Sequence, residues 1–184
     1  MKCIKYKITF YNGERLMKTI YLMLLSATIV LQCSCSMFSS SSKGTVAPPP
    51  QEYKKGGITL SITADPQLNR YKNSSHTLLL CLYQLRDPNA FNQLADDPSS
   101  LSKLMECGKF DSSITYAKRI VVQPGQKLSD QRDLAEGTRY IGIAAGYYTR
   151  GNEKTTHLSP VTTSSTTKID IELGSNEITR VTVK

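Results

Sequence analysis

Apolar and polar residues alternate in short runs along most of the chain after residue 57. In the first run Ile58, Leu60 and Ile62 are separated by Thr and Ser, the period of two that is typical of a strand with one buried face. The run over residues 77–85 is almost continuously apolar and predicts a strand covered on both faces. Short strands separated by turn residues predict a mainly β fold, a β-sandwich. The remaining strands are predicted over residues 113–122, 127–134, 140–148, 168–173 and 177–183.

Two short helices are predicted between the second and third strands, over residues 89–96 and 99–107. Pro98 and Ser99 supply a helix start signal, and Leu101, Leu104 and Met105 recur at the three- and four-residue spacing of one helix face. The sandwich is therefore expected to carry a small helical insertion at residues 89–107.

Residues 1–34 have the organisation of an export signal. Met17 and Lys18 precede a mostly apolar run, residues 19–31, which is followed by small residues and cysteine. The run is too short to span a membrane, which takes about 20 apolar residues. Because the polar stretch before Met17 is unusually long for a signal, we expect translation to start at Met17.

A signal that ends at cysteine resembles the signal of bacterial lipoproteins, in which the cysteine is acylated. Cys35 follows the small residue Ser34, whereas Cys33 follows the bulky Gln32 and has Val30 three residues before it. The peptidase must fit the residue before the cut, so we favour Cys35 as the lipidated residue, with Cys33 as the competing site. Lipoproteins of this kind without Asp after the cysteine usually travel to the outer membrane, and here Ser36 follows.

The chain then divides into a tether and one domain. Residues 35–56 are rich in Ser, Pro, Gly and Lys and cannot build a core, so they predict a flexible tether. Residues 57–184 are left as a single domain.

The net charge of the chain says little about its partners. The net charge is +8, from 23 Lys and Arg against 15 Asp and Glu, but half of it lies before Cys35. With no basic stripe and no interleaving of aromatic and basic residues, the sequence argues against nucleic acid as a partner.

The sequence contains no motif for catalysis, phosphate binding or metal binding, so we expect no cofactor. His76, at a strand edge, and His157, in a predicted polar loop, are expected to be solvated surface residues. Two carboxylate pairs remain as a weak enzyme hypothesis: Asp96 with Asp97, and Asp130 with Asp133.

An alternative function is that of a periplasmic lipoprotein that binds a small ligand or glycan. Tyr140, Tyr147 and Tyr148 would then form a stacking platform on the sandwich. The competing interpretation is that these tyrosines pack in the core or across strands.

Cys81 and Cys107 are an even pair in the predicted domain. Cys81 lies in a strand and Cys107 at the end of the second helix, so a disulfide would attach the insertion to the sheet. Two separately buried thiols are the alternative.

Several segments, taken in order, resemble the TssJ family of type VI secretion lipoproteins. They are the strand end Tyr83-Gln84-Leu85 with Phe91 in the following helix, the turn Pro124-Gly125, and the strand sequence YIGIAAGY at residues 140–147. Residues 65–70, DPQLNR, add to the resemblance, which covers most of the chain from Ile58 onward.

The resemblance implies a transthyretin-like, immunoglobulin-like β-sandwich at the periplasmic face of the outer membrane, held there by N-terminal acyl chains. It implies no enzymatic activity. It also implies that the protein recruits and anchors the periplasmic domain of the inner-membrane protein TssM as the membrane complex assembles. In that family the loop between the first two strands contacts TssM, and physically Leu68 would serve as an apolar anchor among polar neighbours. The expected partner-binding residues are Leu68, Asn69, Arg70, Tyr71, Lys72 and Asn73.

Overall fold

The computed structural model describes residues 47–97, 99–148, 154–161 and 166–184. The predicted signal, Cys35 and most of the tether lie outside the described residues. In the described part of the chain no helix is both long and apolar enough to cross a membrane.

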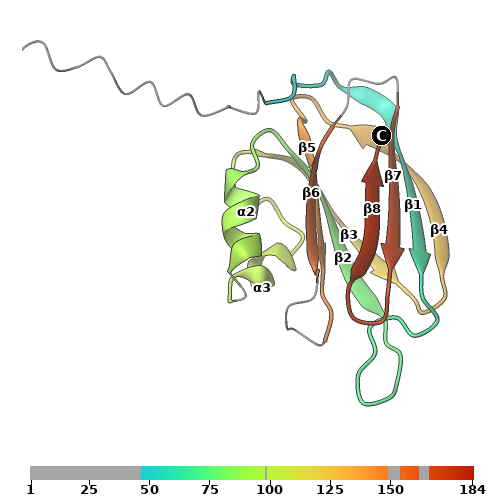
Figure 1. Cartoon of the computed structure of the whole chain (residues 1–184). Helices are drawn as coiled ribbons and strands as arrows, with labels where there is room; N and C mark the ends of the chain where they lie inside the picture. Colours follow the sequence, from blue (N-terminus) through green and yellow to red (C-terminus); the bar gives the residue numbers. More distant parts are fainter. Residues whose placement is uncertain (1–46, 98, 149–153, 162–165) are drawn as a thin grey trace, which may run out of the picture. The chain divides into compact units, whose positions relative to one another are not determined.

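The described domain is a sandwich of two four-stranded sheets (Figure 1), which confirms the predicted fold class. β1 lies between β4, to which it is antiparallel, and β7, to which it is parallel. The first sheet has the order β4-β1-β7-β8, formed by Lys127–Leu134, Lys54–Ala64, Thr167–Leu173 and Ile178–Val183. The second has the order β3-β2-β5-β6, formed by Ile114–Val122, Leu78–Leu85, Tyr140–Ala145 and Thr156–Pro160.

Alternate residues of the strands build the core between the sheets. In β1 the apolar positions predicted from the period of two, Ile58, Leu60 and Ile62, are at most 1% exposed. β2 is buried on both faces, as its continuous apolar run predicts: Leu80 belongs to the cluster between the sheets and Tyr83 to a second cluster under the helices.

The helical insertion consists of α2 (Asn89–Asp96) and α3 (Leu101–Leu104), which lie together beside the second sheet (Figure 1). Phe91 of α2 packs edge to face on Tyr83, with ring centroids 5.8 Å apart. A Cβ atom on Gly142 of β5 would lie only 2.8 Å from the Phe91 ring, so the glycine lets the helix approach the sheet. Burial raises the pKa of Tyr83 to about 12, and its hydroxyl donates to the carbonyl of Leu104.

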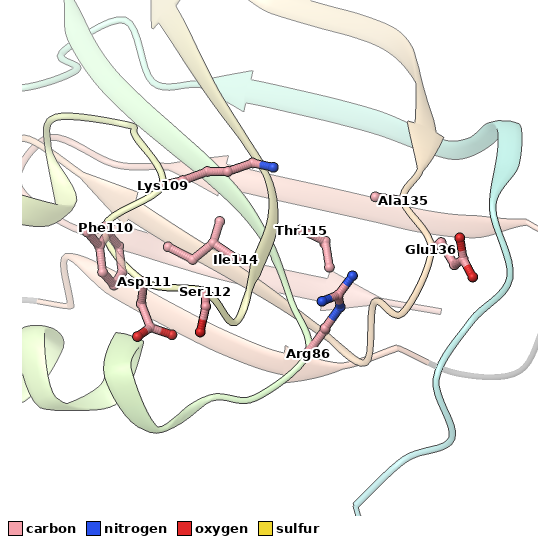
Figure 2. A pocket seen from close by; sticks show the side chains of 9 residues that line it. All are labelled: Arg86, Lys109, Phe110, Asp111, Ser112, Ile114, Thr115, Ala135 and Glu136. Carbon is pink, nitrogen blue, oxygen red and sulfur yellow. The ribbon is translucent and has the colours of Figure 1, made fainter.

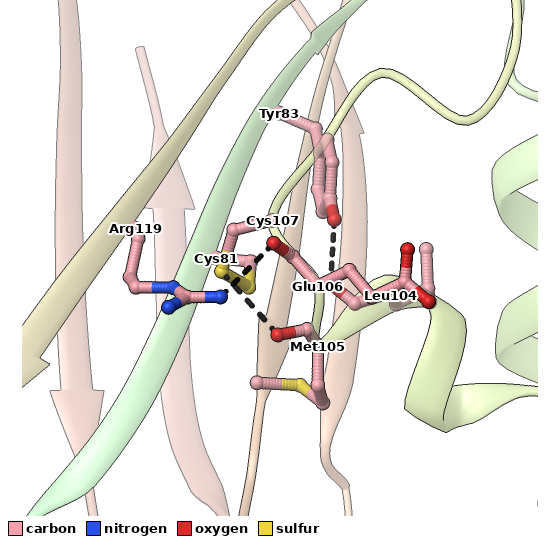
Figure 3. The surroundings of a disulfide bond; sticks show 7 residues. All are labelled: Cys81, Tyr83, Leu104, Met105, Glu106, Cys107 and Arg119. Atoms are coloured by element: carbon pink, nitrogen blue, oxygen red, sulfur yellow. Dashed lines mark hydrogen bonds between the residues drawn. A yellow bond between two sulfur atoms is a disulfide. The ribbon is translucent and has the colours of Figure 1, made fainter.

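A disulfide joins Cys81 of β2 to Cys107 beyond α3, with the two Cα atoms 5.1 Å apart (Figure 3). Arg119 of β3 donates to the carbonyl oxygen of Glu106 at 3.2 Å, beside the bridge. The insertion is thus attached to the sheet covalently as well as by packing.

Four elements differ from the predictions. β5 ends at Ala145 rather than at residue 148. β1 begins at Lys54 rather than Ile58, because a bulge at Gly56 (φ +61°) brings Lys54 into register with Leu134. The second helix spans only Leu101–Leu104 instead of residues 99–107. β6, Thr156–Pro160, was not predicted because Leu158 is its single large apolar residue, and His157 lies in this strand rather than in a loop.

We predict that the disulfide stabilises the domain by about 3 to 4 kcal/mol, the chain-entropy value for closing a loop of this length. All strands and both buried clusters lie within residues 54–184, and residues 46–184 form one compact unit, so a fragment of residues 47–184 contains the whole fold. Equilibrium urea unfolding of this fragment with and without reductant measures the difference. Two free thiols in the denatured, unreduced fragment by alkylation and mass spectrometry would contradict the bridge.

Candidate partner-binding site

The loop between β1 and β2, residues 65–77, projects beyond the sheets at the end of the domain opposite to residues 47–53 (Figure 1). Its tip is a two-residue hairpin, in which the backbone groups of Tyr71 and Ser74 bond each other at 2.9 and 3.0 Å. Lys72 and Asn73 at the turn have φ values of 46° and 64°. Positive φ at both central residues is the geometry of the type I′ turn that fits the twist of paired strands.

The base of the loop is fixed to the domain. Leu68 is fully buried and belongs to the cluster between the sheets. Asn69, 2% exposed, donates from Nδ2 to the carbonyl of Thr77 at 2.9 Å and accepts at Oδ1 from the backbone N–H of Tyr148 at 2.8 Å. The backbone N–H of Arg70 donates to the carbonyl of Ser175, in the turn between β7 and β8.

These contacts correct the prediction for two of the six partner-binding residues. Leu68 was expected to be an apolar anchor for the partner, but its side chain lies in the core. The Asn69 amide uses one polar atom within the loop, on Thr77, and the other on the backbone of Tyr148. Neither side chain is accessible to a partner, and both act by holding the loop.

The other four residues, Arg70, Tyr71, Lys72 and Asn73, are exposed and form the loop tip. Arg70 donates to Gln67 Oε1 at 3.1 Å and to Asn73 Oδ1 at 3.3 Å, which steadies the guanidinium group above the hairpin. Lys72 Nζ lies 5.3 Å from the centre of the Tyr71 ring, within the range of a cation–π contact. The tip therefore offers positive charge and aromatic surface together.

Tyr148, from the segment after β5, lies beside this tip. Its ring stacks on Tyr71 with centroids 5.4 Å apart and planes at 26°, and His76 meets it edge to face at 5.0 Å. Sequence reasoning placed Tyr148 in a different site, because nothing local connects it with a loop some seventy residues earlier.

The predicted tyrosine platform is not formed. Tyr147 is 3% exposed and its hydroxyl donates to the carbonyl of Glu177, whereas Tyr140 packs against the cluster under the helices. Burial raises the pKa of Tyr147 well above its usual range. The three rings therefore lie in separate environments, and only Tyr148 is exposed.

Three of the four carboxylates in the predicted pairs, Asp97, Asp130 and Asp133, have structural roles. The Asp97 carboxylate accepts from the hydroxyls of Ser100 and Ser99, which lowers its pKa. The Asp133 carboxylate accepts from the N–H of Gly56 and the hydroxyl of Tyr53, which also lowers its pKa, and Asp130 pairs with Arg132. Burial lowers the pKa of His157, whose ring bonds Ser159. Among the described residues no group of three or more metal-ligating side chains occurs.

A polar pocket of about 670 Å³ lies at the other end of β2, remote from the loop tip (Figure 2). Arg86 lies against Gly137, whose φ of +79° and lack of a side chain make room for it. Lys109 and Glu136 contribute opposite charges, and Asp111 is held by the backbone N–H of Ser113. The pocket pairs no nucleophile with a base.

The chain is similar to known proteins of one secretion system. The family model for type VI secretion lipoproteins (T6SS-SciN; VasD, EvfM, TssJ) matches residues 57–176. The search of curated proteins finds no match. The type VI secretion lipoprotein TssJ1 from Pseudomonas aeruginosa is similar in structure, with a TM-score of 0.60 and 23% identity over 74% of this chain and 98% of that one.

Two further structures share the fold. Serratia marcescens Lip, a membrane-bound component of the type VI secretion system, matches with a TM-score of 0.54 and 20% identity over 68% of this chain and 96% of that one. A structure described as the TssM C-terminal domain from EAEC has a TM-score of 0.54 and 19% identity over 66% of this chain and 94% of that one. At these identities the likeness concerns the fold, whereas the family model covers most of the sequence. The chain belongs to the TssJ family of type VI secretion lipoproteins.

Proposed function

We propose that this lipoprotein is anchored at the periplasmic face of the outer membrane by acyl chains on Cys35. We propose further that it recruits and anchors the periplasmic domain of the inner-membrane protein TssM during assembly of the secretion membrane complex. The observation that carries this proposal is the exposed, preformed tip of the β1–β2 loop. The family supports the secretion system, and the similar structure described as a TssM C-terminal domain supports the choice of partner.

The ends of the domain suit a link between two membranes. Residues near Gln51 are held at the end opposite to the loop, where the backbone of Gln51 bonds Thr138 and Gly137 at 2.9 and 2.8 Å. β1 then runs from Lys54 to Ala64, roughly 33 Å at about 3.3 Å per residue, and delivers the chain to the loop. The end at which the tether joins the domain is therefore separate from the loop that we propose binds TssM.

A binding role also fits the chemistry of the described residues better than catalysis or glycan binding. Asp97 and Asp133 accept hydrogen bonds in turn and strand contacts, the His157 ring bonds Ser159, and the three tyrosines proposed as a platform are dispersed. We therefore propose no enzymatic activity and no cofactor, and the glycan-binding alternative loses its predicted surface.

The substitution Arg70→Glu is expected to weaken binding of the TssM periplasmic domain by about 1 to 4 kcal/mol, because it reverses the charge at the centre of the loop tip. Calorimetric titration of residues 47–184 against the TssM domain from the same cell measures the change. Lys168→Glu, on β7 near the end where the chain enters, makes the same change in net charge on an exposed residue and serves as the matched control. Equal affinities of both variants and the wild type would show that Arg70 is not part of the interface. No binding by the folded wild-type domain would refute the proposed function.

Lipidation at Cys35 predicts that Cys35→Ala abolishes incorporation of labelled palmitate and releases the protein from the outer-membrane fraction. Cys33→Ala should leave both unchanged, since Cys33 is removed with the signal. The opposite pattern, labelling lost only in Cys33→Ala, would assign the acyl chains to Cys33.

A further inference from the structure

We propose that Tyr148 completes the partner-binding surface, so that the β1–β2 loop and Tyr148, which follows β5, bind the partner together. We propose further that this surface recognises an acidic patch of the partner protein that is rich in hydrogen-bond acceptors. The inference rests on the proposed function, because it names the extent and chemistry of the same site.

The first support is the way in which the two segments are joined. Asn69 Oδ1 accepts the backbone N–H of Tyr148 at 2.8 Å, and the Tyr148 ring stacks on Tyr71 at 5.4 Å. The tip and Tyr148 are therefore presented as one unit before any partner arrives. A surface that is already ordered loses less conformational entropy on binding.

The second support is exposure. Tyr71 is 44% and Tyr148 59% exposed, although both are large aromatic residues. Tyr53, also 59% exposed, offers a contrast, since its hydroxyl donates to Asp133 and it lies near the end where the chain enters. Neither Tyr71 nor Tyr148 hydrogen-bonds another described residue through its hydroxyl. Exposed tyrosines beside an arginine are the residue types that dominate binding energy at protein interfaces.

The third support is charge. The loop, residues 65–77, contains Arg70, Lys72 and His76, and its single carboxylate, Asp65, lies at the base and accepts from the N–H of Gln67. The guanidinium and ammonium groups are hydrogen-bond donors, and each free tyrosine hydroxyl can add another. A surface of this kind is complemented by carboxylates and backbone carbonyls, arranged around an apolar spot that receives the tyrosine rings.

The experiment compares the affinity of the TssM periplasmic domain for residues 47–184 and for three variants of that fragment. Tyr148→Ala is expected to raise Kd about tenfold or more, as loss of a tyrosine hot spot does. Tyr148→Phe keeps the stacked ring and should raise Kd by a smaller factor. Tyr53→Ala removes an equally exposed tyrosine near the other end and should leave Kd unchanged. Thermal unfolding of each variant confirms that the domain is folded.

A titration in increasing NaCl tests the acidic partner. Affinity should fall steadily between low and high salt, because screening weakens the attraction between exposed charges. Affinity independent of salt would overturn the acidic patch. Wild-type binding that Tyr148→Ala leaves unchanged would overturn the composite surface while the proposed function stands. No binding by the wild-type domain would overturn the proposed function and this inference with it.

Discussion

Burial of Leu68 is the constraint on which the loop end of the domain depends. After β1 ends at Ala64 the chain turns back and places Leu68 in the core before it projects outward. Burying such a side chain contributes about 2 kcal/mol, and it brings Asn69 to the position where its amide joins Thr77 and Tyr148. The exposed hairpin is thus the outer part of a segment whose base belongs to the core, and the loop can present charge and aromatic rings in a fixed arrangement.

The rest of the sandwich keeps this end rigid. β2, which follows the loop, is covered on one face by the other sheet and on the other by α2 and α3, with the Cys81–Cys107 bridge between them. At its far end Gln84, fully buried, donates to the carbonyl of Asp133 and accepts from the N–H of Ala135. These two hydrogen bonds satisfy the buried amide and join β2 to the end of β4, in the opposite sheet, and to the residue that follows it. The strand that carries the loop is therefore fixed along its whole length.

Much of the fold could be predicted from local patterns, because residues 58–64 of β1 and all of β7 alternate between buried and more exposed positions and β2 is apolar except for Gln84. The edge strand β6 could not be predicted. A strand at the edge of a sheet buries few side chains, and Leu158 alone cannot show an alternation of apolar and polar residues. At the site, the loop itself and the exposure of Arg70 and Lys72 were predicted. Leu68 was misassigned because an apolar residue in a polar loop can be an exposed anchor or a core residue. Tyr148 was missed because its contact with Tyr71 exists only after folding.

The central claim is that a preformed loop tip, together with Tyr148, is the surface that meets TssM. Hydrogen–deuterium exchange of the domain with and without the TssM periplasmic domain tests it most directly. The account predicts new protection of the backbone amides of Lys72, Asn73 and Ser75, which donate to no described residue in the free domain, with unchanged exchange in α2, in α3 and around Gln51 at the other end. Protection confined to the helical insertion or to the edge strands β3 and β8, with the loop unchanged, would contradict it.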